Sequence, residues 1–142
     1  MRGFLLDTTA ISELARQKAN AGLVAWLSAH DAADTFLAAP CVGELAIGIA
    51  LMDHSKKRRS LEGWLEKLVR EFDRRILPFD TQAALLWGRA VGDSRKRGRS
   101  LPAIDSQIAA IASMRGLALV TRNVRHFKSE AFPGLEVIDP WR

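Results

Sequence analysis

The sequence is poor in cysteine and histidine and has no long apolar stretch. Cys41 is the only cysteine among 142 residues, so a disulfide within the chain is impossible and a reducing cytoplasm is the expected compartment. A single cysteine with three histidines, His30, His54 and His126, also argues against a zinc site. No apolar run reaches the length of a transmembrane helix, and residues 3–6 are too few for the core of a signal peptide. We therefore expect no membrane association.

Positive charge is in excess and is clustered. The formal net charge is +5. Basic residues gather in three stretches, at residues 56–59, 95–99 and 122–128. Each stretch alone is typical of a solvated surface. Together they favour a polyanionic partner, of which nucleic acid is the commonest.

Apolar segments alternate with amphipathic segments along the chain. Short apolar runs predict strands at residues 3–7, 35–39, 75–79, 117–121 and 136–138. Helical spacing of apolar residues predicts helices at residues 10–17, 23–30, 40–52, 61–72, 81–96 and 102–115. The alternation predicts an α/β fold, a three-layer α/β/α sandwich with a mainly parallel central sheet, formed by one domain over residues 1–142.

Particular residues mark the predicted helix ends. Thr8 or Thr9 is expected to cap the first helix, and Asp80 the fifth. Pro40 suits the first position of the third helix, and Gly116 suits the position just after the last one.

Some side chains have simpler expected roles. Cys41 is expected to be a small buried residue, and His30 and His54 are expected at the surface. An apolar stripe runs along the fourth helix and consists of Leu61, Trp64, Leu65 and Leu68. The stripe predicts either core packing or a groove for the helix of a partner.

Three acidic residues stand at the ends of predicted elements. Asp7 closes the first strand, whereas Glu44 and Asp105 lie in the first turns of helices that begin near prolines. Such positions collect along one edge of an open α/β sheet, where ligands bind in these folds. Three carboxylates in one cleft repel each other unless a cation is present, and oxygen ligands suit Mg²⁺ or Mn²⁺. The pattern predicts a metal-dependent hydrolase of phosphate esters.

The end of the predicted strand 117–121 adds polar groups to the same edge. Asn123 is a candidate catalytic residue, because its amide can accept from a metal-bound water or donate to a phosphate oxygen. Four further side chains are candidate substrate-binding groups: Thr9, Thr121, Arg122 and Arg125.

Four fragments stand out along the chain: FLLDTT at residues 4–9, ELAIG at 44–48, PAIDSQIAA at 102–110 and LVTRNVRHF at 119–127. Together they resemble PIN-domain ribonucleases, and most closely the VapC-like toxins of type II toxin–antitoxin pairs. Each fragment alone is weakly specific, whereas the four in this order are strongly specific.

The resemblance implies a role for each matching residue. Asp7, Glu44 and Asp105 would bind Mg²⁺ or Mn²⁺. Asn123 stands where many PIN domains carry a fourth acid, and His126 stands where members often have aspartate. His126 is therefore an outer-shell candidate.

The resemblance also implies the activity and the partners. The chain would be a cytoplasmic endoribonuclease toxin that hydrolyses RNA phosphodiester bonds with a metal-activated water. Its partners would be an RNA substrate, a cognate antitoxin and a second copy of itself in a homodimer.

Two other functions share parts of this pattern. An aspartyl phosphotransferase also begins with a strand ending in aspartate, but it requires a second acid close behind, where this chain has Thr8 and Thr9. A catalytically weak PIN-like module that only binds RNA or a partner is the stronger alternative, because Asn123 replaces an acid.

Overall fold

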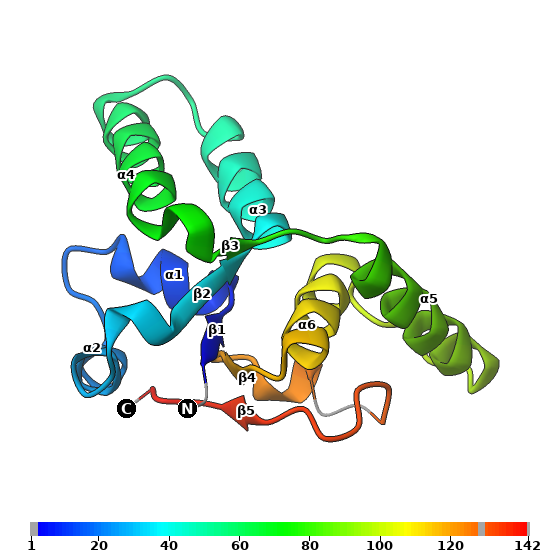
Figure 1. Ribbon diagram of the computed structural model, residues 1–142. Coiled ribbons are helices and arrows are strands. Elements are labelled where there is room, and N and C mark those ends of the chain that lie inside the picture. Colours follow the sequence, from blue (N-terminus) through cyan, green and yellow to red (C-terminus); the bar gives the residue numbers. More distant parts are fainter. Residues whose placement is uncertain (1–2, 128–129, 142) are drawn as a thin grey trace.

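The structure is a computed structural model that describes residues 3–127 and 130–141. A parallel sheet forms its centre. Its strands lie in the order β3-β2-β1-β4-β5, and every neighbouring pair is parallel (Figure 1). The five strands are β1 (Phe4–Leu6), β2 (Thr35–Ala38), β3 (Ile76–Leu77), β4 (Ala118–Val120) and β5 (Val137–Ile138).

Helices cover both faces of this sheet. Figure 1 shows α1 and α2 on one side and α5 and α6 on the other, while α3 and α4 pack together and project beyond the strands. The predicted three-layer α/β/α sandwich is thus confirmed. The helices are α1 (Thr8–Leu14), α2 (Ala21–Ser28), α3 (Ala39–Ala50), α4 (Lys56–Phe72), α5 (Thr81–Lys96) and α6 (Ala103–Arg115), with short 3-10 turns η1 (Ala32–Asp34), η2 (Asp73–Arg75) and η3 (Val124–His126).

The first helix begins earlier than predicted, because its cap is Asp7. The Asp7 carboxylate accepts the Ala10 backbone N–H at 3.0 Å, which satisfies one of the unpaired donors of the first turn. The prediction of Thr8 or Thr9 as the cap was wrong. An acid that ends β1 therefore also starts α1.

Other helix ends follow the sequence more closely. Asp80 caps α5 by accepting the Ala83 N–H at 2.9 Å, as predicted. Gly116 closes α6 in a left-handed conformation with φ 65°, also as predicted. Pro40 is the second residue of α3 rather than the first, a position that still requires no N–H partner.

The core fills the space between the sheet and its helices. Leu5 and Leu6 of β1 are almost completely buried, as are Leu119 and Val120 of β4. Cys41 is fully buried, which confirms its predicted role as a small core residue. None of the helices in the described ranges is both long enough and apolar enough to cross a bilayer.

One histidine expected at the surface packs against two aromatic rings. The His30 ring stacks on Trp26 with 4.1 Å between ring centroids and meets the edge of Phe4. Its Nδ1 lies 2.6 Å from the Trp26 carbonyl oxygen, one helical turn earlier. His30 is therefore half-buried rather than fully at the surface, because it lies against Trp26 just after the end of α2, and an aromatic ring covers apolar surface well.

Replacement of Gly116 by alanine tests the helix stop. Gly116→Ala is expected to lower the free energy of unfolding by about 1–2 kcal/mol, because an L-residue is strained at its positive φ. Gly63→Ala is the matched control: a Cβ meets open space at both positions, but Gly63 lies within α4. Alanine there should stabilise by about 0.5–1 kcal/mol. Urea unfolding measures both, and equal effects would contradict the assignment of strain.

Candidate active site

The carboxyl ends of β1 and β4 meet at one edge of the sheet. Leu6 is in register with Val120, so the residues that follow them, Asp7 and Thr121, lie side by side. The Asp7 backbone N–H donates to the Val120 carbonyl at 3.0 Å. The expectation that the end of β4 shares an edge with Asp7 is therefore confirmed.

Asp7 is a buried carboxylate surrounded by hydrogen-bond donors. Only 2% of the surface of Asp7 is exposed to solvent. One oxygen, Oδ1, accepts the Ala10 N–H at 3.0 Å and the Thr9 hydroxyl at 2.6 Å. The other, Oδ2, accepts a short hydrogen bond from the Thr121 hydroxyl. These donors fix both carboxylate oxygens in place.

The environment of Asp7 disfavours its negative charge. Burial has the largest effect and raises the pKa of the carboxyl above its ordinary value. The hydrogen bonds from Thr121, Thr9 and the Ala10 amide lower the pKa but do not cancel this effect. The charge of Asp105 raises it further, so Asp105 lies close enough to repel Asp7.

The turn after β4 is tied to the same carboxylate. The Arg122 N–H donates to the Thr9 hydroxyl at 3.1 Å, and the Asn123 N–H donates to the Thr121 hydroxyl at 2.9 Å. Thr121 is completely buried and its hydroxyl holds Asp7, so its predicted substrate-binding role stays a prediction. Arg122 is exposed and Asn123 half-buried, which leaves both accessible to a ligand.

Asp105 lies in the first turn of α6, as predicted. Its Oδ2 is 2.9 Å from Nδ1 of His126, which belongs to η3. The favourable field of a helix N-terminus acts on Asp105. Arg125, next to His126, is exposed. His126 was only an outer-shell candidate from the sequence, and the residue it contacts could not be identified there.

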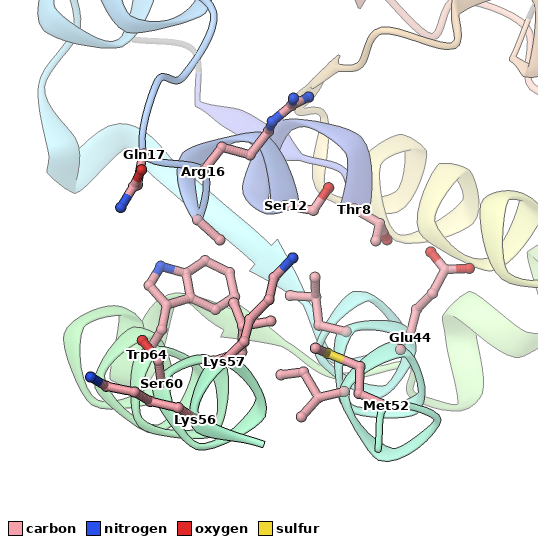
Figure 2. A pocket seen from close by; sticks show the side chains of 15 residues that line it. Thr8, Ser12, Arg16, Gln17, Glu44, Met52, Lys56, Lys57, Ser60 and Trp64 are labelled. Atoms are coloured by element: carbon pink, nitrogen blue, oxygen red, sulfur yellow. The ribbon is translucent and has the colours of Figure 1, made fainter. Parts of the chain in front are cut away.

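Glu44 projects from α3 and is half-buried. Figure 2 shows its carboxylate directed toward Thr8 at the start of α1. Burial raises the pKa of the Cys41 thiol to about 12, and the charges of both Asp7 and Glu44 contribute to this increase. The Cys41 sulfur thus lies within electrostatic reach of both acids, and its raised pKa argues against a nucleophilic role.

A groove of about 1000 Å³ extends from Glu44 between α1, α3 and α4 (Figure 2). Its lining is mainly apolar and includes Leu61 and Trp64 of the predicted stripe, whereas Leu68 is buried in the core. Three basic side chains complete the lining: Arg16, Lys56 and Lys57. Leu68 thus confirms core packing for part of the stripe, whereas the use of the groove by a partner helix stays a prediction.

The basic stretches are distributed unevenly around this edge. Residues 56–59 open α4 beside the groove, and Arg122 and Arg125 lie in the turn after β4. Residues 95–99 lie at the C-terminal end of α5, which points away from the sheet (Figure 1). Lys128, the end of the third stretch, is outside the described residues.

The donor chemistry of this edge fits a divalent cation. Between residues 3 and 127 and between 130 and 141, no lysine or arginine forms an ion pair with Asp7, so its buried charge lacks a countercharge. A cation beside Asp7 and Asp105 would offset both desolvation and repulsion, and carboxylate oxygens suit Mg²⁺ or Mn²⁺. In the same ranges no three His, Cys, Asp or Glu side chains are already grouped as a metal site, and Glu44 lies in the adjoining groove.

The uncompensated charge of Asp7 leads to a stability prediction. In metal-free protein at neutral pH, Asp7→Asn is expected to raise the free energy of unfolding by on the order of 1 kcal/mol, because asparagine caps the helix without charge. The pKa of the Asp7 carboxyl in the folded protein lies above its ordinary value, because the side chain is buried. The advantage of the variant should therefore be small at acidic pH and grow as pH rises through the folded-state pKa.

Urea unfolding in the presence of a chelator, at acidic and neutral pH, measures this effect. Asp80→Asn is the control, because Asp80 makes the same capping bond on the exposed α5 and the two residue types cap equally well. Its expected effect is close to zero. A lower stability for Asp7→Asn at neutral pH would contradict the prediction.

The sequence and the fold both resemble known proteins. Residues 4–132 match the PIN domain family. The chain is 38% identical over 138 residues to the plasmid stability protein StbB of Pseudomonas syringae pv. tomato, covering 96% of this chain and 97% of that protein. It is 36% identical to toxin FitB of Neisseria gonorrhoeae, with the same two coverages, and 31% identical to VapC ribonuclease Y4jK of Sinorhizobium fredii, covering 96% of both.

Solved structures agree with these relationships. The fold superposes on the crystal structure of FitAcB from Neisseria gonorrhoeae with a TM-score of 0.86 and 36% identity, covering 98% of this chain and 99% of that one. A structure of FitAB bound to an IR36 DNA fragment also gives a TM-score of 0.86, with 34% identity and coverages of 98% and 96%. The resemblance inferred from the four fragments is confirmed, and the chain belongs to the PIN-domain family.

Proposed function

We propose that this chain is an endoribonuclease that depends on Mg²⁺ or Mn²⁺ and acts as the toxin of a toxin–antitoxin pair. The observation that carries the proposal is the buried Asp7 carboxylate, held by three donors beside Asp105 at the strand edge. This arrangement occurs in a PIN-domain chain whose relatives include a VapC ribonuclease and toxin FitB. A tRNA(fMet)-specific endonuclease VapC of Salmonella typhimurium is a further relative, 34% identical over 79 residues.

The acids have the first role in this proposal. Asp7, Glu44 and Asp105 would hold the cation. When bound, the cation supplies a water of lowered pKa and draws charge from the phosphate oxygens. Thr9 and Thr121 hold the Asp7 carboxylate in one orientation, so its side chain would not have to move in order to bind the cation.

The neighbouring turn has the second role. Asn123 is proposed as a catalytic residue that contacts the phosphate or water through its amide. Arg122 and Arg125, both exposed, are proposed to bind the RNA backbone. Thr9 is half-buried, and its hydroxyl already links Asp7 to the Arg122 N–H, so we assign it to positioning.

The toxin assignment includes partners. A cognate antitoxin would cover the apolar groove between α1, α3 and α4, which ends near Glu44. The names FitAB and VapBC of the similar structures support the existence of such a complex. A homodimer, a cytoplasmic location and a single PIN domain over residues 1–142 complete the proposal.

The alternative is a PIN-like module that binds RNA or a partner with weak or no catalysis. Asn123 is the observation that favours it, because the position carries an acid in many PIN domains. The retention of Asp7 in a preorganised, energetically costly environment favours the nuclease instead.

Loss of one acid tests the nuclease directly. Asp105→Asn is expected to reduce Mn²⁺-dependent cleavage of cellular RNA by at least about 100-fold, because the second charge beside Asp7 is removed. Asp53→Asn is the matched control, since Asp53 is exposed in the connection between α3 and α4. Gel analysis of RNA with and without a chelator measures the activity. Undiminished cleavage by Asp105→Asn would eliminate the proposed site, and no cleavage by the wild type would favour the binding module.

Contact between Arg122 and RNA can be tested through the salt dependence of RNA binding, independently of cleavage. Arg122→Gln should weaken binding of a labelled single-stranded RNA and lower the slope of log affinity against log salt concentration by about 0.7, the value for one phosphate contact. Fluorescence anisotropy with a chelator present measures binding without cleavage. Arg70→Gln, on the exposed side of α4, is the control and should leave the slope unchanged. An unchanged slope for Arg122→Gln would exclude the contact.

A further inference from the structure

One turn of the chain contacts both acids of the strand edge. Thr121 begins this turn and donates to Oδ2 of Asp7. His126 ends it and lies with Nδ1 at 2.9 Å from Oδ2 of Asp105. The two acids come from distant parts of the chain, the end of β1 and the first turn of α6, and residues 121–126 connect them.

The turn itself is firmly placed. The Asn123 N–H donates to the Thr121 hydroxyl at 2.9 Å, and the His126 N–H donates to the Asn123 carbonyl at 3.0 Å. Phe127, which follows directly, is 5% exposed and anchors the end of the turn in the core. The His126 ring therefore starts from a fixed backbone position.

The chemistry of the contact fixes the tautomer of His126. An ionised carboxylate only accepts hydrogen bonds, so the proton of the imidazole must be on Nδ1. Within residues 3–127 and 130–141, His126 is the one side chain hydrogen-bonded to Asp105. The contact occupies Oδ2 and leaves Oδ1 as the carboxylate oxygen without a described partner.

We infer that His126 is a positioning residue for the proposed metal site, which holds the Asp105 carboxylate in one orientation through Nδ1–H. The inference rests on the proposed function, in which Asp105 is a ligand. Hydrogen bonds from outer residues orient the ligands of metal sites, and their loss lowers metal affinity by roughly 10–100-fold.

The effect of His126 should be on metal binding and not on folding. The two side chains are 39% and 22% exposed, and hydrogen-bonded pairs this accessible to water contribute little to stability. A variant that loses the contact should therefore fold normally but bind the cation less tightly. This separation distinguishes positioning from a general structural role.

Two variants separate the two nitrogens of the ring. The amide nitrogen of asparagine lies about as far from the backbone as Nδ1, whereas that of glutamine lies about as far as Nε2. His126→Asn should keep the hydrogen bond to Asp105, and His126→Gln should lose it. His54→Gln is the matched control, because His54 is an exposed histidine on the connection before α4.

Calorimetric titration of the metal-free full-length chain with Mn²⁺ is the experiment. We expect wild type, His126→Asn and His54→Gln to bind with similar affinity, and His126→Gln to bind about 10–100-fold more weakly. Thermal unfolding without metal should give the same midpoint for all four proteins.

The outcomes separate the inference from the function on which it rests. If the wild type binds Mn²⁺ and His126→Gln binds it equally well, the inference is overturned and the nuclease proposal stands. If both His126 variants lose affinity to the same degree, Nδ1 has no special role, and the inference is also overturned. If the wild type takes up no Mn²⁺, the metal-dependent function fails first, and the inference fails with it.

Discussion

The rest of the site depends on how the Asp7 carboxylate is held. One oxygen caps α1, and the other joins β1 to β4 through the Thr121 hydroxyl. A buried charge of this kind costs stability unless it is compensated, and its raised pKa records that cost. The same arrangement gives a carboxylate that needs no reorganisation before it binds a cation. Asp7 therefore lowers the stability of the metal-free fold while it keeps the carboxylate ready to bind a cation.

The parallel topology determines which side chains join Asp7. Because β1 lies between β2 and β4, the segments that leave all three strands emerge at one edge. The segment after β2 is α3, which carries Glu44 beside the groove, and the turn after β4 carries the polar residues 121–126. Only Asp105 reaches this edge from the start of a helix that follows another helix, α5. Its place is set by the packing of α6 against α5 and α3.

Sequence reasoning succeeded where the signal was local. Asp80 and Gly116 mark helix ends by chemistry that acts within a few residues, and both were placed correctly. It failed where one side chain had two roles: Asp7 was identified as a ligand, and its capping bond was therefore given to Thr8 or Thr9. The contact between His126 and Asp105 spans 21 residues of sequence and depends on tertiary packing, so no local pattern could show it. The apolar run before Thr121 predicted a strand, but the complete burial of the Thr121 side chain beside Asp7 depends on tertiary packing that this run does not show.

The double role of Asp7 also restricts how this chain can diverge. Most replacements at this position would remove the cap of α1 together with the charge, so the stability gained by losing a buried charge would be offset by the loss of the cap. Asparagine is the main exception, because it keeps the capping oxygen. Descendants of this chain that have lost nuclease activity should therefore carry asparagine at position 7 more often than chance allows, because that residue still caps the first turn of α1.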